Sequence, residues 1–175
     1  MRIVHLAAGA GQMYCGACNR DMALLRGLMD RGHHIEVIPL YTPLRIEDGN
    51  IETSEIFLGG INAYLQQHLD LFHHTPRFLD RLFDHPRLLR WAASMAVQTS
   101  PADLGPMTVS VLQGRDGRQG KELDRLIEYL KGSEPPDLFS ITNSLLIGIA
   151  PELKSHFDVP VICGLQGEED FVSRM

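Results

Sequence analysis

The chain has 175 residues, of which 44% are hydrophobic and 22% are charged, and its formal net charge is -6 at pH 7. This length and composition fit one domain with its own core. A net acidic chain lacks the basic field that binds phosphate backbones, which argues against nucleic-acid binding. No apolar run reaches the ~18 residues of a membrane span, and residues 1–6 do not form a signal-peptide pattern. The three cysteines are too few for a disulfide framework. We therefore expect a cytoplasmic protein.

The first forty residues predict a βαβ unit. Residues 3–8 form an apolar, strand-like run, and residues 9–16 are rich in glycine. Apolar residues then recur at helical spacing as far as Gly32, which is typical of a helix end. Residues 35–40 form a second strand-like run, and Pro39 is expected to mark its C-terminal end. Such a unit implies a parallel sheet with right-handed crossovers.

The middle of the chain predicts mainly helices. Residues 50–58 contain a candidate short strand, and a helical insert follows over about residues 60–132. Pro101 and Pro106 are expected to interrupt the helical pattern within it. Residues 120–131 form the clearest amphipathic helix of the chain. Its apolar stripe consists of Leu123, Leu126, Ile127 and Leu130.

The last third returns to alternating strands and helices. Residues 137–142 and 159–164 are strand-like. Asn143 and Ser144 are typical helix N-caps, so a helix is expected to begin there and to reach about residue 157. Pro151 lies within it, either as a kink or as the first turn of a second segment.

Three acidic residues, Glu168, Glu169 and Asp170, follow the last strand-like run. They either hold substrate hydroxyls or favour the positive end of a helix dipole, and both interpretations stay open. Because the chain stops at Met175, about one turn into this expected helix, we expect one domain of a longer protein.

The glycine-rich loop after the first strand is the best candidate for ligand contact. Gly9, Ala10, Gly11 and Gln12 let the backbone approach a ligand closely, and the following helix points free N–H groups into the same space, which favours an anion such as phosphate. The carboxyl ends of parallel strands are also where ligands bind. The loop is neither a dinucleotide fingerprint nor a P-loop, because Tyr14 stands at the third glycine position and no lysine follows. A plain tight turn is the alternative.

Cys15 and Cys18 form a C-x-x-C motif at the expected helix start. A helix N-terminus lowers a thiol pKa and the second thiol can resolve a mixed disulfide, so a redox pair is one interpretation. The interpretation we favour is that small thiols fill a tight loop-to-helix junction. A zinc site needs further ligands, which neither Cys163 nor the eight histidines offer at a second tight spacing, so we expect no metal site.

Two passages resemble the family-4 retaining glycosyltransferases. Residues 31–37, R-G-H-H-I-E-V, resemble the family passage R-G-H-x-V-x-V, and residues 160–168, P-V-I-C-G-L-Q-G-E, resemble P-V-V-x-T-x-H-G-E/D. The resemblance implies an α/β fold, a Rossmann-like three-layer sandwich with a mostly parallel sheet and a helical insert. Residues 1–175 would be the single N-terminal, acceptor-side domain of a GT-B enzyme whose C-terminal donor domain is absent from this chain.

The resemblance also implies an activity and a set of site residues. Such enzymes transfer a sugar from a nucleotide-sugar donor, and the loop from Gly9 to Gln12 would face the donor phosphates. Gln166 stands at the catalytic position usually held by His, where a Gln can hydrogen-bond a sugar but cannot act as a base. Leaving-group stabilisation would come largely from the donor domain, so the isolated chain is expected to be nearly inactive. The implied acceptor-binding residues are Asn143, Ser144, Gly167, Glu168 and Glu169.

The implied partners are the C-terminal donor-binding domain in the same polypeptide and a sugar or glycolipid acceptor, with no cofactor bound in this domain. Aromatic residues of the insert allow contact with a membrane surface, but packing on their own core gives the same pattern and is favoured. These aromatic residues are Phe72, Phe78, Phe83 and Trp91. Two alternatives to a transferase are a standalone α/β binding domain and a thiol-redox protein that uses Cys15 and Cys18.

Overall fold

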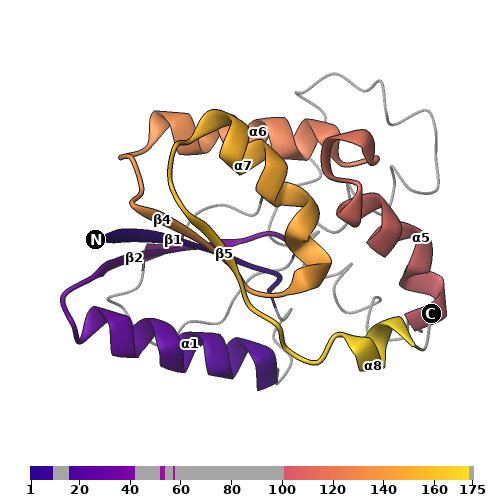
Figure 1. The fold of residues 1–175 in the computed structure, drawn as a ribbon, viewed down its shortest axis with the longest axis horizontal. Helices are drawn as coiled ribbons and strands as arrows, with labels where there is room; N and C mark the ends of the chain where they lie inside the picture. The colour runs from indigo at the N-terminus through magenta and orange to yellow at the C-terminus, as the bar shows by residue number, and fades with distance from the viewer. Residues whose placement is uncertain (10–15, 42–51, 54–56, 58–100, 174–175) are drawn as a thin grey trace, which may run out of the picture.

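The fold is built on a five-stranded sheet with the strand order β3-β2-β1-β4-β5, in which every pairing is parallel (Figure 1). The computed structural model describes residues 1–9, 16–41, 52–53, 57 and 101–173. The strands are β1 (Arg2–Ala7), β2 (His34–Pro39), β3 (Glu52–Thr53), β4 (Leu138–Ile141) and β5 (Val161–Cys163). The predicted α/β class with a parallel sheet is confirmed, and the arrangement is consistent with a Rossmann-like fold.

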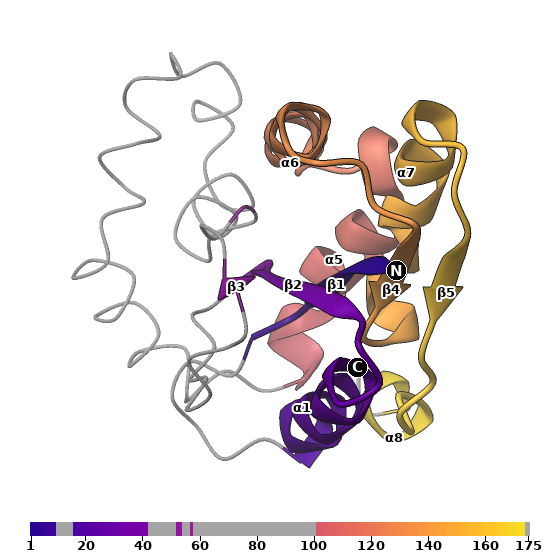
Figure 2. The same cartoon turned by 90° about the vertical axis from the view of Figure 1, so that its left-hand side faces the viewer.

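Helices cover both faces of the sheet (Figures 1 and 2). Helix α1 (Gly16–Met29) and the short α8 (Glu169–Val172) lie on one side, and α6 (Gly120–Gly132) and α7 (Ala150–His156) lie on the other. The remaining helical segments are α5 (Pro101–Leu112), η2 (Gly114–Asp116) and η3 (Ser144–Ile149). Among the described segments, no helix has both the length and the apolar character needed to cross a bilayer.

Strand β1 shows how one sheet forms two cores. Side chains alternate along a strand, so Ile3 and Ala7 pack with residues of α1, whereas Val4 and Leu6 pack with residues of α6 and α7. Burial on both faces is typical of parallel sheets. The same alternation places His5, which lies between Leu6 and Val4, on the α1 side.

Several predicted elements are confirmed. All four residues of the predicted stripe in α6 are buried in the core between the sheet and the helices. β2 ends at Pro39, the last position of its ladder with β1, as predicted; the N–H groups of Leu40 and Tyr41 still donate to the Ala7 and Ala8 carbonyls just beyond it. Within the candidate strand at residues 50–58, most of which lies outside the described residues, β3 is described at Glu52 and Thr53. Of the predicted insert, residues 101–132 are described and are largely helical, whereas the four aromatic residues lie outside the described residues.

The predicted interruption at Pro106 is wrong. α5 runs from Pro101 to Leu112 with Pro106 inside it. Pro101 occupies the first helical position, where a missing N–H costs nothing. Contacts of α5 with η3 offset the single hydrogen bond that Pro106 cannot donate.

The predicted helix cap at Asn143 is also wrong. Asn143 precedes η3, but its side chain makes no capping hydrogen bond. The segment that follows is not one α-helix: η3 is a 3₁₀ segment, and α7 begins after it with Pro151 in its first turn. The second of the two alternatives for Pro151 is therefore the observed one.

A partly buried ion pair joins β1 and β2 near the amino ends of the strands. Arg2 Nη2 lies 2.5 Å from Glu36 Oε2, and the Tyr129 hydroxyl donates to Glu36 Oε1 at 2.7 Å. The backbone N–H of Arg2 donates to the Asp137 carboxylate at 2.7 Å, just before β4. These contacts join β1, β2, α6 and the start of β4.

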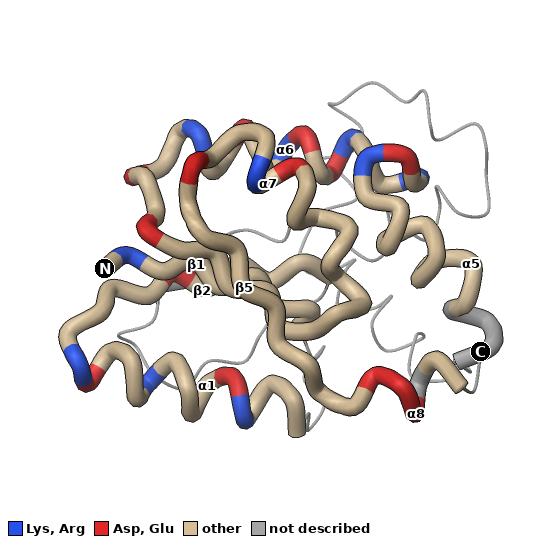
Figure 3. The backbone as a smooth tube through the Cα atoms, viewed as in Figure 1, with Lys and Arg blue, Asp and Glu red and all other residues tan. Residues whose placement is uncertain are grey.

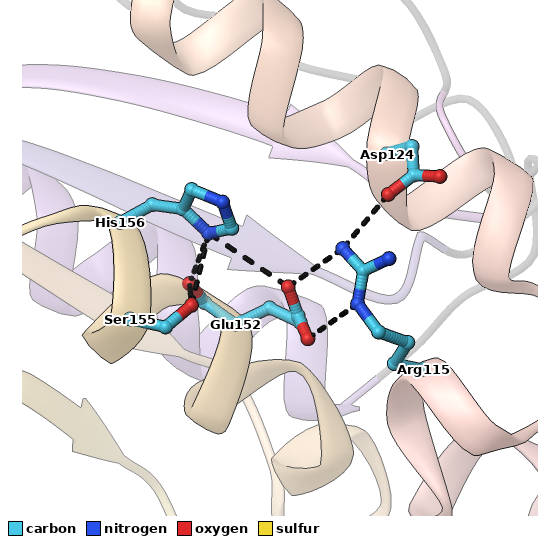
Figure 4. A network of polar contacts seen from close by, with 5 residues as sticks. All are labelled: Arg115, Asp124, Glu152, Ser155 and His156. Carbon is cyan, nitrogen blue, oxygen red and sulfur yellow. Dashed lines mark hydrogen bonds and ion pairs between the residues drawn. The ribbon is translucent and has the colours of Figure 1, made fainter.

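A second polar network lies on the surface of the helical layer (Figure 4). Arg115 of η2 donates to both carboxylate oxygens of Glu152 on α7, at 2.6 and 2.8 Å, and to Asp124 of α6 at 2.8 Å. The pKa of Glu152 is held below its ordinary value chiefly by the hydrogen bonds from Arg115. The network positions η2 against two helices, and its exposure keeps its contribution to stability small.

Candidate functional site

The strand order places a topological switch point between β1 and β4. The chain builds outward from β1 to β2 and β3, then crosses to β4 on the other side of β1 and continues to β5. In open parallel sheets, ligands bind outside the carboxyl ends of the strands at such a point. The segments that follow β1, β4 and β5 therefore define the candidate site.

Buried polar residues meet beneath α1 at this edge of the sheet. His5 lies with its Nδ1 3.1 Å from Ser140 Oγ on β4 and its Nε2 3.6 Å from Asp21 Oδ2 on α1. The hydroxyl of Thr142, the residue after β4, donates to the same Asp21 oxygen. His5 is 2% exposed and Asp21 5%, so the group is shielded from solvent. We name His5, Asp21, Ser140 and Thr142 the polar cluster.

The positions of these residues follow from strand and helix periodicity. Ser140 and Thr142 alternate with Phe139 and Ile141, which face the opposite core, so they face α1. Asp21 lies four residues before Leu25, the most buried residue of α1, and therefore on the same helix face.

Asp21 is an acceptor that stays ionised. Burial acts to raise its pKa, but contacts with the His5 ring and the Thr142 hydroxyl, together with the charge of Arg20, outweigh burial and leave the pKa below its ordinary value. Both carboxylate oxygens of Asp21 accept hydrogen bonds, one from Thr142 and one from Gln166.

Gln166 joins the polar cluster from the segment after β5. Its Nε2 donates to Asp21 Oδ1 at 2.9 Å and to the Thr142 carbonyl at 2.7 Å, and lies 3.2 Å from Thr142 Oγ1. Gly164 makes this approach possible, because a Cβ at that position would lie 2.6 Å from the Thr142 carbonyl oxygen. The chain passes so close to β4 here that a side chain would collide with its backbone.

Glu168 fastens the segment after β5 to the segment after β4. Its Oε1 accepts from the Ser144 N–H and its Oε2 from the Gln166 N–H, both at 2.7 Å. Gly167, with φ +79°, supplies the turn between these residues. Partial burial acts to raise the pKa of Glu168, but the backbone hydrogen bonds outweigh it and lower the pKa. Glu168 thus provides the cap on η3 that the sequence predicted for Asn143.

Comparisons with protein-family models, with curated proteins and with solved structures found no match. The case for a function therefore depends on the geometry of the site and on the sequence motifs.

The structure brings together the predicted acceptor-binding residues that flank β4 and β5. Glu168 accepts from the Ser144 N–H, and Gln166 donates to the carbonyl of Thr142, the residue before Asn143. Glu169 is exposed and begins α8, where its charge favours the helix amino end.

The predicted phosphate-facing loop is only partly within the described residues. Gly9, two residues after the end of β1, has φ +91°, a conformation that glycine adopts without strain. Ala10, Gly11, Gln12 and Cys15 lie outside the described residues. Cys18 lies in the first turn of α1 and is partly buried.

Sequence reasoning missed His5, Asp21, Ser140 and Thr142. The sequence carried two signals for them. Polar residues stand within the apolar runs of β1 and β4, and an acidic residue, Asp21, stands on the apolar face of α1. Within the described residues, no group of three or more His, Cys, Asp or Glu side chains is arranged to hold a metal ion.

An open hollow of about 530 Å³ lies along α5 and η2, where its lining includes Pro106, Ser110 and Arg118. It shares no residue with the polar cluster or with Gln166 and Glu168. The candidate site is therefore the carboxyl edge of the sheet, where the topology and the motif residues coincide.

Proposed function

We propose that the chain is the N-terminal, acceptor-side domain of a GT-B, family-4-like retaining glycosyltransferase. In this proposal the enzyme moves a sugar from a nucleotide-sugar donor to an acceptor, and a donor-binding domain follows in the same polypeptide. One observation carries the proposal. The passage that resembles the family, residues 160–168, delivers Gln166 and Glu168 to the switch-point edge beside Asn143 and Ser144.

The chemistry of this edge suits a polyhydroxylated ligand. Amide, hydroxyl and carboxylate groups gather there, and these are the groups that exchange hydrogen bonds with sugar hydroxyls. α8 adds acidic residues on the same side of the sheet as α1 (Figure 3). The donor phosphates would instead be held at the loop that begins at Gly9 and leads to the amino end of α1, where free N–H groups favour an anion.

Gln166 does not supply a base, since an amide cannot take up a proton at neutral pH. The proposed role of Gln166 is to bind and orient a sugar. Stabilisation of the charge on the leaving phosphate would depend on groups positioned across the cleft.

Nucleotide-sugar turnover tests the proposal. The complete gene product would be incubated with UDP-glucose, UDP-galactose, UDP-N-acetylglucosamine or GDP-mannose, and the released nucleotide diphosphate would be measured by chromatography. We expect turnover of at least one donor, a loss of tenfold or more in Gln166→Ala, and no change in the surface control Asp30→Asn. Residues 1–175 alone should be nearly inactive. Absence of turnover with every donor, or equal turnover by residues 1–175, would contradict the proposal.

A further inference from the structure

The side-chain amide of Gln166 is held at one end and open at the other. All three of its side-chain contacts are made by Nε2, and the three atoms that Nε2 faces are oxygens of Asp21 and Thr142. Oε1 accepts no hydrogen bond from the described residues, and it is not among the polar atoms buried without a partner. The carbonyl end of the amide therefore reaches the surface of the site.

The surrounding oxygens fix which end of the amide points inward. The Asp21 carboxylate and the Thr142 carbonyl are acceptors only, and the Thr142 hydroxyl already donates its hydrogen to Asp21. Turning the amide over would place Oε1 against these acceptors and would lose the hydrogen bonds donated by Nε2. The polar cluster thus tolerates one orientation of Gln166.

We propose that Asp21 is a positioning residue which, with Thr142, turns the Gln166 carbonyl toward the ligand, so that this position accepts a hydrogen bond from a hydroxyl group of an uncharged sugar and rejects phosphate. The inference rests on the proposed function in taking the ligand to be a sugar. A sugar hydroxyl donates to Oε1 without bringing a charge, whereas phosphate, although its protonated oxygens can also donate, brings negative charge to a position beside the carboxylates of Asp21 and Glu168.

Charge around Gln166 supports the same choice of ligand. The carboxylate of Asp21 bonds to its side chain and the carboxylate of Glu168 to its backbone N–H, so two negative groups flank the residue. Arg20, whose charge adds to the contacts of His5 and Thr142 in lowering the pKa of Asp21, lies exposed on α1. A ligand anion placed at Gln166 would meet like charges on both sides.

The test uses the side-chain ¹⁵N–H₂ resonance of Gln166 in the 175-residue chain. Hydrogen exchange of this amide should be slower than that of the exposed Gln113 by about tenfold or more, because its hydrogens are held by partly buried acceptors. Asp21→Ala should remove most of this protection. Asp21→Asn, which keeps one acceptor oxygen, should restore part of it, and the matched control Asp30→Ala should leave it unchanged.

The preference for a sugar over phosphate is then measured as the chemical-shift change of the same Gln166 resonance. The probes are the methyl glycosides of glucose, mannose and galactose, and N-acetylglucosamine, each compared with inorganic phosphate at equal concentration. At least one sugar should shift the Gln166 resonance and phosphate should not. Asp21→Ala should weaken the sugar response several-fold without abolishing the folded spectrum.

The possible failures are distinguishable. Exchange of the Gln166 amide as fast as that of Gln113 would overturn the inference and leave the proposed function untouched. A response to phosphate rather than to any sugar would overturn the assignment of Oε1 as a hydroxyl acceptor. Absence of nucleotide-sugar turnover in the complete gene product, with the Gln166 signature intact, would count against the proposed function alone.

Discussion

Glu168→Gln tests whether one carboxylate holds the two loops of the candidate site together. The wild-type side chain accepts two hydrogen bonds of 2.7 Å from the Ser144 and Gln166 N–H groups. Gln keeps one acceptor oxygen but places an N–H₂ group against the other N–H. Hydrogen bonds to charged groups contribute about 1.5–3 kcal/mol each. The partial exposure of Glu168 lowers that value, so we expect the free energy of local opening to fall by about 2 kcal/mol.

The assay is native-state hydrogen exchange of the Ser144 and Gln166 backbone amides. A loss of about 2 kcal/mol corresponds to exchange that is roughly 30-fold faster at these two sites. Because the folded-state pKa of Glu168 lies below its ordinary value of 4.5, the stabilisation is present above that value and is lost as the pH falls through the folded pKa. The difference between wild type and Glu168→Gln should therefore disappear in strong acid.

The matched control is Glu169→Gln, which makes the same chemical change at the exposed neighbouring residue. It should leave both exchange rates within about twofold of wild type, as expected for a surface substitution. Equal effects of the two substitutions would refute the idea that the Glu168 carboxylate joins the loops.

Three further substitutions and one pH profile test the frame around the site. Gly164→Ala should destabilise the chain by about 1–3 kcal/mol in urea unfolding, because its Cβ would lie 2.6 Å from the Thr142 carbonyl oxygen; an unchanged midpoint would show that the two segments are not in close contact. Leu126→Ala removes a fully buried side chain and should cost about 2–5 kcal/mol, seen as a lower Tm. Glu36→Ala leaves the partly exposed Arg2 with Glu134 as its carboxylate partner and removes the acceptor of the Tyr129 hydroxyl, so it should cost about 1–3 kcal/mol by the same unfolding assay. Because the pKa of Asp21 lies below its ordinary value of 3.8, the carboxylate stabilises the fold above pH 3.8 and this stabilisation is lost as the pH falls through the folded-state pKa. The free energy of unfolding of Asp21→Asn should therefore depend less on pH than that of wild type in this window.

The strands and the amphipathic helix could be predicted because their signal is local. β1, β2, β4 and β5 are apolar runs bounded by glycine, proline or polar residues, and α6 carries an apolar stripe at helical spacing. The switch-point location of the site also follows from the alternation of strands and helices, since it depends on chain order.

The polar cluster could not be predicted because its contacts join distant parts of the chain. Asp21 and Thr142 are 121 positions apart, and Asp21 and Gln166 are 145 apart. No local sequence pattern specifies which strands are neighbours in the sheet. The sequence therefore does not predict that these residues contact one another. Asn143 has the local character of a cap, but the carboxylate of Glu168, 24 positions after Ser144, makes the stronger charge-assisted hydrogen bond.

The ion pair of Arg2 and Glu36 has a consequence for how the domain can change. It anchors the strands near their amino ends, whereas Gln166 and Glu168 follow β5 at its carboxyl end. Under the proposed function, substitutions that change recognition therefore fall in loops remote from the groups that hold the strands in place. A library that varies residues 143–144, 165–166 and 169–170 while fixing residues 2, 36, 129, 167 and 168 should keep the scaffold folded, and under the proposed function it should sample new acceptors.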